Sequence, residues 1–163
     1  MPIVSTDIQF RLSGGAANSD PSASLGGAKS STAASNYFDD VSSSEAGTGD
    51  TEYRCIYVHN NHATLTLLGS KIFIQTNTPS GDTDVAIALG SSAISGTEQV
   101  IADENTSPSG VTFSAPASFA AGLSIGDLAA GAHKAVWVRR TVNPGAAAFS
   151  DSFTLRVQGD TNP

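Results

Sequence analysis

The chain has 163 residues and a mass of 16.5 kDa, a size that suits one domain with or without an additional arm. Its 8 basic and 15 acidic side chains give a net charge of −7, whereas a protein that binds nucleic acid normally presents a basic face. We therefore expect no nucleic-acid partner. Only 14% of the residues are charged, and Gly, Ala, Ser and Thr supply much of the remainder.

The single cysteine, Cys55, excludes an intrachain disulfide. It lies in a strand-like run, which predicts a small buried apolar residue and not a nucleophile, since no base or oxyanion site is indicated. No run approaches the roughly 20 apolar residues that span a bilayer, and the opening residues lack the basic start and apolar core of a secretory signal. We expect a protein made in a cytoplasm, with no membrane partner.

A first strand is predicted at residues 3–12, where Ile8, Phe10 and Leu12 alternate with polar residues. The character then changes. Residues 13–35 contain one large apolar side chain, Leu25, which is too little to offset the ordering entropy of such a segment alone. Two readings stay open: a flexible loop, or a long Gly/Ala/Ser-rich arm that orders only against a partner or a neighbouring subunit.

A short island of aromatic and acidic residues follows the arm. Tyr37 and Phe38 are candidates to anchor the returning chain on the folded domain. Asp39 and Asp40 offer oxygen ligands for a hard cation, but the spacing of a calcium-binding loop is absent, so we predict no metal site there. Residues 42–50 are read as a polar turn.

The stretch from residue 51 to residue 89 has the densest apolar content and several strand signals separated by turn residues. Its predicted strands are residues 53–58, 63–68, 71–75 and 84–89. Gly69-Ser70 is predicted to be the two-residue turn of a hairpin. His59 and His62 have no nearby cysteine or carboxylate in the sequence, and we interpret them as exposed turn residues and not as metal ligands.

Further strands are predicted at residues 98–102, 111–113, 133–142 and 152–158. The last one alternates clearly, with Phe153, Leu155 and Val157 expected to point inward. Trp137, the only tryptophan, is expected to pack in the core, with an interface anchor as the alternative.

Two arginines follow this tryptophan. Strand alternation places Arg139 and Arg140 on opposite sides of their strand. Arg139 is expected near Trp137, and the pair could offer a small cationic patch to the carboxylates of a partner.

About nine short strands, with almost no helical periodicity, predict an all-β protein. The expected fold is an antiparallel β-sandwich, immunoglobulin-like or jelly-roll-like, with an extended N-terminal arm; the alternative is an antiparallel β-barrel. We divide the chain into residues 1–49, an N-terminal strand plus the arm, and residues 50–163, the sandwich. The first strand is expected to pair at a sheet edge or with a neighbouring molecule.

The chain resembles small structural proteins of tailed-phage virions. The stretches that carry this resemblance are PIVSTDIQFRLSGGAANSDPSASLGGAKSS, YRCIYVHNNHATLTL, IFIQTNTPSGDTDVAIALG and LAAGAHKAVWVRRTVNPGAAAFSDSFTLRVQGDT. The resemblance implies a β-sandwich or jelly roll without enzymatic activity, made in the host cytoplasm and located in the virion. It contains no diagnostic motif and supplies no catalytic residue.

Within that class we expect a capsid decoration (cement) protein that stabilises the phage head by bridging subunits of the major capsid protein. We expect it to form a homo-oligomer, a trimer, with no cofactor. The alternatives are a tail or baseplate component, and a module that binds carbohydrate or a host surface. An enzyme is not expected, because no nucleophile is paired with a base. The candidate partner-binding residues are Leu25, Tyr37, Phe38, Trp137, Arg139 and Arg140.

Overall fold

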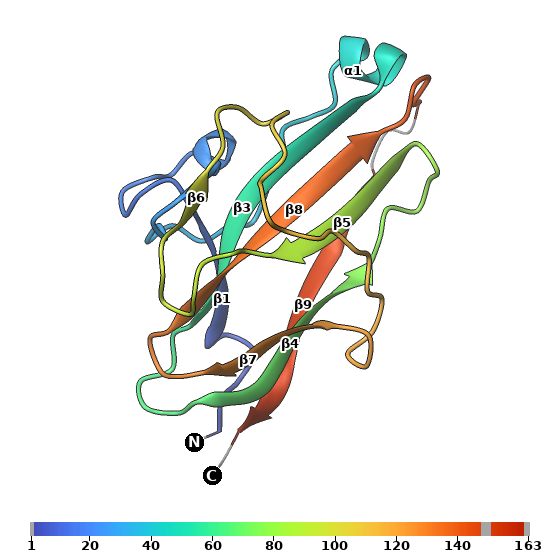
Figure 1. Cartoon of the computed structure of the whole chain (residues 1–163). Helices are drawn as coiled ribbons and strands as arrows, with labels where there is room; N and C mark the ends of the chain where they lie inside the picture. The colour runs from blue at the N-terminus through green and yellow to red at the C-terminus, as the bar shows by residue number, and fades with distance from the viewer. Residues whose placement is uncertain (1, 148–150, 162–163) are drawn as a thin grey trace.

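The computed structural model of the chain describes residues 2–147 and 151–161, and these form two packed antiparallel sheets (Figure 1). The larger sheet has the strand order β1 (Ile8–Leu12), β3 (Asp50–Asn60), β8 (His133–Val142) and β5 (Thr83–Leu89). The smaller sheet has the order β7 (Leu123–Leu128), β4 (Leu67–Thr76) and β9 (Thr154–Thr161). A short third pair is formed by β2 (Gly26–Gly27) and β6 (Glu98–Val100).

The core lies between the larger and the smaller sheet and is built from every second residue of their strands. Its buried members include Leu12, Ile56, Val58, Ile72, Ile74, Val85, Ile87, Ile125, Leu128, Val136, Val138 and Leu155. Each such side chain contributes about 1.5–3 kcal/mol when it leaves water. The predicted antiparallel β-sandwich is therefore confirmed, and the described strands form open sheets, not the closed barrel that was the alternative.

The N-terminal strand β1 is the edge strand of the larger sheet. It pairs antiparallel with β3, with Ile8 opposite Asn60 and Leu12 opposite Ile56. Of the two pairings expected from the sequence, the one at a sheet edge is present. Residues from the N-terminal segment and from the sandwich segment thus share one sheet.

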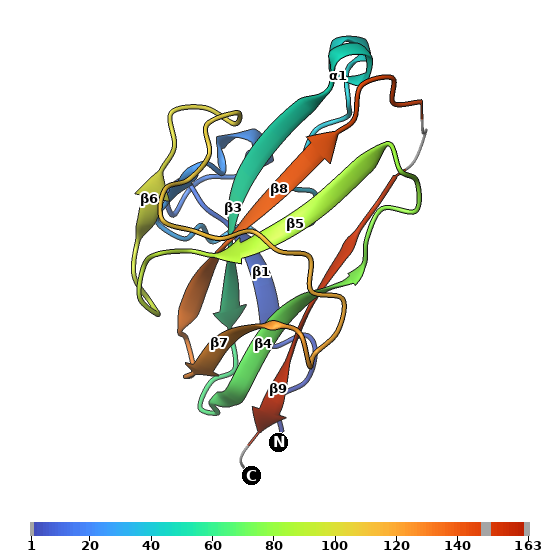
Figure 2. The same ribbon diagram turned by 45° about the vertical axis from the view of Figure 1, so that its right-hand side comes forward.

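Residues 13–35 form an ordered arm over the outer face of the larger sheet, the face turned away from β4 and β9 (Figure 2). The backbone N–H of Cys55 donates to Ser24 O at 2.7 Å, and Ser13 Oγ donates to Cys55 O at 2.8 Å. Both serines are buried. Two interpretations of residues 13–35 were given above: a flexible loop, and an arm that becomes ordered only against a partner. Both are wrong, because the arm finds its hydrogen-bond partners within the chain.

A second buried cluster fills the space between this arm and the larger sheet. It contains Cys55, Tyr57, Ala88, Ile101, Ala135 and Trp137, with Leu25, Tyr53, Val111 and Phe113 packed against it. Residues 91–115 also cover this face of the sheet. We call residues 13–35 and 91–115 together the outer layer. Because the outer layer covers one face of β3 and β8 and the smaller sheet covers the other, both faces of these strands are apolar.

The predicted hairpin at Gly69-Ser70 is wrong. Strand β4 continues from Leu67 to Thr76 through these two residues. Gly69 has a φ of 55°, and the register of β4 shifts between Leu67 and Ser70, so the residues that looked like a turn form a bulge inside a strand. The predicted strand at residues 63–68 is mostly loop.

Three further differences from the predicted elements concern short segments. Residues 111–113 are not a strand; they pass beside β5, where Ser114 and Ile87 form an isolated bridge. The strand β7 was not predicted. The polar turn expected at residues 42–50 contains a helix, α1 (Ser43–Thr48), which begins with a capping box between Ser42 and Glu45.

Both ends of the chain lie at the pole of the sandwich opposite α1, as Figures 1 and 2 show. In the described part of the chain, no helix combines the length and apolar character needed to cross a bilayer.

Candidate functional site

Charged side chains enter the interior at the end of the larger sheet near α1. Along β3, the inward-facing positions change from Val58 and Ile56 to Arg54 and Glu52, and the last two are fully buried. Arg140 on β8 lies opposite Glu52 in the register of the two strands. The apolar core between the sheets therefore ends in a polar layer at this pole.

Phe38, from the loop before α1, covers this polar layer. Its ring centre lies 5.5 Å from the guanidinium carbon of Arg54 and 4.8 Å from that of Arg140. The side chain of Phe38 is buried. Cation–π contacts of this kind contribute about 2 kcal/mol when they are shielded from water, so they hold the loop on the sheet.

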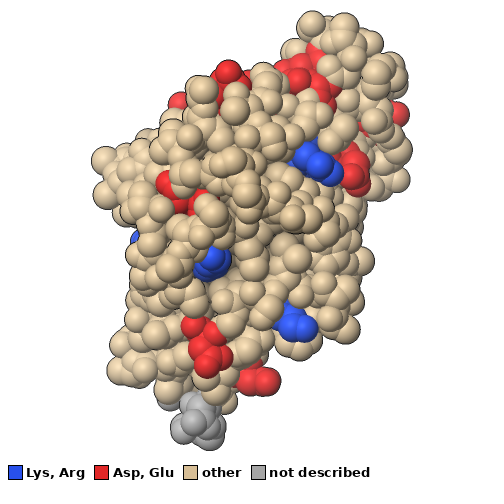
Figure 3. Space-filling model, viewed as in Figure 1, with Lys and Arg blue, Asp and Glu red and all other residues tan. Residues whose placement is uncertain are grey.

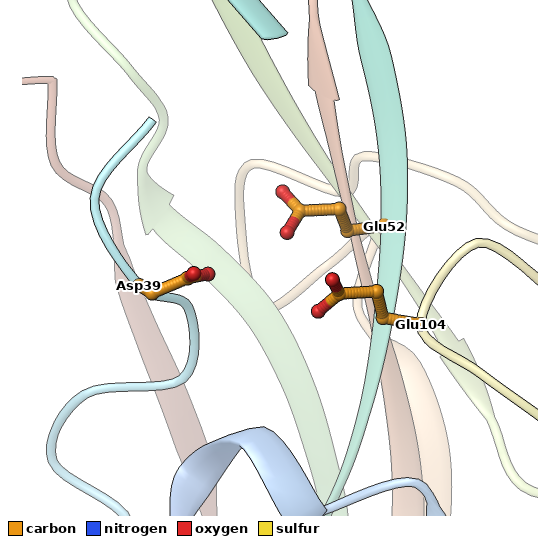
Figure 4. Close-up of side chains that lie close together, drawn as sticks. All are labelled: Asp39, Glu52 and Glu104. Carbon is orange, nitrogen blue, oxygen red and sulfur yellow. The ribbon is translucent and has the colours of Figure 1, made fainter. Parts of the chain in front are cut away.

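Three carboxylates complete the polar layer and extend toward one another from three different segments (Figure 4). Glu52 Oε2 accepts a hydrogen bond from Arg140 Nε at 2.6 Å, and Glu104 forms an ion pair with Arg54. Asp39 Oδ1 lies 3.8 Å from Arg54 and 3.7 Å from Arg140. Two arginines thus face three acids, of which Glu52 alone is fully buried and needs its charged partner for that reason.

Glu52 has one carboxylate oxygen that is unpaired in the described chain. Its Oε1 is buried and has no hydrogen-bond partner within the described residues. Burial raises the pKa of Glu52 above its usual range, and the neighbouring Arg140 offsets this only in part.

A cleft of about 690 Å³ opens beside the polar layer. Its walls come from residues 35–41, from residues near the start of β5 and from residues 151–153. The rings of Tyr37 and Phe153 lie 5.7 Å apart in it, and Asp151 accepts a hydrogen bond from Thr83 Oγ1 at 2.6 Å. Ring faces beside carboxylates suit a ligand with one apolar face and several hydroxyl groups.

A second buried acid, Glu98, lies on the other face of the larger sheet, beneath the outer layer. Its carboxylate accepts hydrogen bonds from Ser91 N at 3.2 Å, Ser92 N at 2.9 Å and Trp137 Nε1 at 3.4 Å. The hydroxyl of Ser91 also donates to it, at 3.0 Å. Burial alone would raise the pKa of Glu98, but these hydrogen bonds outweigh it and lower the pKa to about 2.

The outer layer carries a shallow groove of about 530 Å³. Its lining is mainly Gly, Ala and aliphatic residues: Gly14, Gly15, Ala23, Leu25, Gly26, Gly27, Ala28, Val100, Ile101 and Ala102. Val100 is 71% exposed, the largest exposure among the large apolar residues of the described chain. This groove gives the outer layer an apolar point of contact.

The six candidate residues from the sequence fall into three places. Tyr37, Phe38 and Arg140 come together at the cleft, although Phe38 and Arg140 are buried. Leu25 lines the groove of the outer layer.

The remaining two candidates lie on the outer face of β8. Arg139 stacks over Phe113, 5.1 Å from the ring centre, and Phe113 in turn packs against the buried cluster that contains Trp137. Trp137 is fully buried, which confirms its predicted core packing, and its side chain presents no surface for an interface anchor. The opposite orientation of Arg139 and Arg140 is as predicted.

Sequence reasoning missed the four acids and bases that shape the two polar centres: Glu52, Arg54, Glu98 and Glu104. One signal was present. Glu52 and Arg54 have the same strand parity as Ile56 and Val58, so two charges continue a buried stripe.

His62 lies in the loop after β3, but it is half-buried and not exposed as predicted, and its Nδ1 accepts hydrogen bonds from the backbone N–H groups of Thr64 and Leu65. The prediction of an exposed turn residue is wrong for His59, which belongs to β3, is half-buried, and has its ring 6.5 Å from that of His133. Burial lowers the pKa of both His59 and His133.

Comparisons of the chain with protein-family models, with curated proteins and with solved structures gave no match.

Proposed function

We propose that the chain is a non-enzymatic structural protein of a phage virion, a decoration protein that sits on the head and bridges neighbouring capsid subunits. The observation that carries this proposal is the outer layer. It forms a preformed surface, rich in small side chains, that covers the outer face of the larger sheet around Cys55, Tyr57 and Trp137.

The outer layer carries few charges. Residues 13–35 contain only Asp20 and Lys29 as charged side chains, and residues 91–115 contain only Glu98, Asp103 and Glu104, of which Glu98 is buried. Figure 3 shows that charged side chains are also sparse and scattered over the face viewed there. Such a surface can be covered by another protein without the cost of desolvating many charges.

Small side chains also lose little rotamer entropy when they are covered, and Gly and Ala lose almost none. The arm is already ordered in the single chain, so docking does not have to order it. Each contact remains modest, but an oligomer that docks on a repeating shell multiplies the affinity of each copy. A homo-trimer that bridges capsid subunits would use this multiplication.

The proposal is tested by attaching the purified chain to particles that lack it and counting copies by imaging and mass spectrometry. Hundreds of copies on the head support it, whereas a few copies at the tail would instead favour a tail or baseplate component. Sedimentation of the free protein tests the expected trimer.

A matched pair of variants tests the outer layer itself. Val100→Asp places a charge at the groove, and Val4→Asp places one at another exposed valine, in the N-terminal segment before β1. We expect Val100→Asp to reduce head occupancy at least about tenfold, a change of about 1.4 kcal/mol, and Val4→Asp to leave it unchanged. Equal occupancy of the two variants argues against docking through the groove.

A second candidate function rests on the cleft. The Tyr37–Phe153 ring pair beside Asp151 is a lining that suits a carbohydrate. Binding on a glycan array that is lost in Tyr37→Ala would favour a module that binds a host surface. An array without signal removes this candidate.

A further inference from the structure

A second group of acids lies where α1 meets β3. One carboxylate oxygen each from Glu45, Asp50 and Glu52 lies within 4.8 Å of the other two. Oxygens that share one Ca²⁺ ion each lie about 2.3–2.6 Å from it, so any two of them are at most about 5 Å apart, and the three acids meet this condition.

The hydrogen bonds around these acids occupy one oxygen of each. Glu45 Oε2 accepts from Ser42 N at 2.6 Å in the capping box. Asp50 Oδ1 accepts from the backbone N–H of Thr51 at 2.8 Å and from Asn105 Nδ2 at 2.8 Å. These bonds orient both carboxyl groups and leave the second oxygen of each available to a ligand.

Glu52 supplies the independent sign of a ligand. The residue is fully buried, its Oε2 is bound to Arg140, and its Oε1 has no partner among the described residues. A buried carboxylate oxygen without a donor destabilises the folded chain, and a bound cation would remove that penalty.

Charge distinguishes this group from the neighbouring group of Asp39, Glu52 and Glu104. In that group two arginines face three acids, and their guanidinium nitrogens take up the carboxylates. Within the described residues no Lys or Arg forms an ion pair with Glu45 or Asp50, so the negative charges of these two acids remain for a divalent ion.

We propose that Glu45, Asp50 and Glu52 form a binding site for a hard divalent cation of the Ca²⁺ type at the junction of α1 and β3. The three acids provide three of the oxygens that Ca²⁺ takes, one from each carboxylate, and water completes its shell. The ion would tie the only α-helix of the described chain to the central strand of the larger sheet.

Calorimetric titration of the purified full chain with CaCl₂, after treatment with a chelator, tests the site. We expect one ion per chain, with a dissociation constant between about 10 µM and about 1 mM, and a higher unfolding temperature in calcium than in chelator. Mg²⁺ should bind at least about tenfold more weakly, since it requires a stricter octahedral geometry.

Two pairs of variants distinguish binding by these three ligands from a general attraction of cations to the acidic pole near α1. Glu45→Gln and Asp50→Asn keep the orienting hydrogen bonds and should each weaken Ca²⁺ binding at least about tenfold. Asp39→Asn and Glu104→Gln remove the same charge from the neighbouring group and should change the affinity less than about twofold. All four residues are partly or fully exposed, so the variants should fold.

Two outcomes overturn the proposal. One is the absence of binding heat up to about 10 mM Ca²⁺. The other is equal weakening by all four variants, which would show that the ion follows the overall acidity of this pole and not these three ligands.

Discussion

The pKa values of the two buried glutamates, on opposite faces of the larger sheet, are shifted in opposite directions. Glu98 receives four hydrogen bonds from uncharged donors and keeps its charge, whereas Glu52 has a full counter-charge beside it and a raised pKa. The difference lies in the number of donors that reach both oxygens. One arginine that satisfies only Oε2 does not compensate for the burial of the whole group.

The largest effect is expected where the counter-charge of Glu52 is removed. Arg140→Ala should lower the free energy of unfolding by about 3–5 kcal/mol, because it leaves a buried acid without its partner and removes a contact with Phe38. Urea denaturation followed by Trp137 fluorescence measures this loss. Arg139→Ala is the control, since Arg139 is half-buried over Phe113 and should cost about 1 kcal/mol. Equal losses would contradict the special role of the inner arginine.

Glu98→Gln should lower the free energy of unfolding at neutral pH by about 3 kcal/mol, the value that corresponds to a pKa lowered from 4.5 to about 2. Because the folded pKa is the lower one, this stability is complete above 4.5 and is lost as the pH falls toward 2. The difference in the free energy of unfolding between wild type and Glu98→Gln should therefore decrease over that pH range.

Denaturation curves at several pH values test this narrowing. Asp160→Asn, at an exposed acid on β9, should differ little from wild type throughout. A gap for Glu98→Gln that stays constant down to about pH 2.5 would show that the hydrogen bonds do not depress the pKa.

Glu52→Gln should have a smaller effect, about 1 kcal/mol, with the opposite pH dependence. The folded pKa of Glu52 is raised, so its contribution is complete below 4.5 and is lost as the pH rises through the folded value. Wild type should therefore lose stability relative to the variant as the pH rises above 4.5. The same series of denaturation curves provides the measurement. If the free energy of unfolding of wild type relative to Glu52→Gln increases with pH, the pKa of Glu52 is not raised.

The burial of Cys55, which shares the outer face with Glu98, can be tested without any substitution. Its thiol is buried beneath the outer layer, and burial raises its pKa. A thiol reagent should label the native protein at least about 100-fold more slowly than the denatured protein. Rapid native labelling would mean that the outer layer opens locally.

The strands that sequence patterns predicted best are those with one buried face and one solvent-exposed face. In β9, Leu155 is buried and Val157 packs on the core while Arg156 is exposed, as the alternation indicated. For Trp137 the size and the apolar neighbours were enough to predict burial.

Other features depend on contacts between distant segments. Gly69-Ser70 has the composition of a turn, and only its pairing with β7 and β9 makes it a bulge. The ordered arm depends on two hydrogen bonds to a residue about 30–40 positions away: Ser13 Oγ donates to Cys55 O, and Cys55 N donates to Ser24 O. The strand parity of Glu52 points to its burial, but its pairing with Arg140 depends on the register of β3 and β8.

The common position of the two chain ends, at the pole away from α1, has a practical consequence. A short linker can join residues 161 and 2, and new ends can be opened in the loop between β4 and β5, to give a circularly permuted protein. In the natural order, a peptide or enzyme fused at either end projects from the same pole. The outer layer and the acids near α1 then stay uncovered, and the domain becomes a carrier that presents its cargo in one direction.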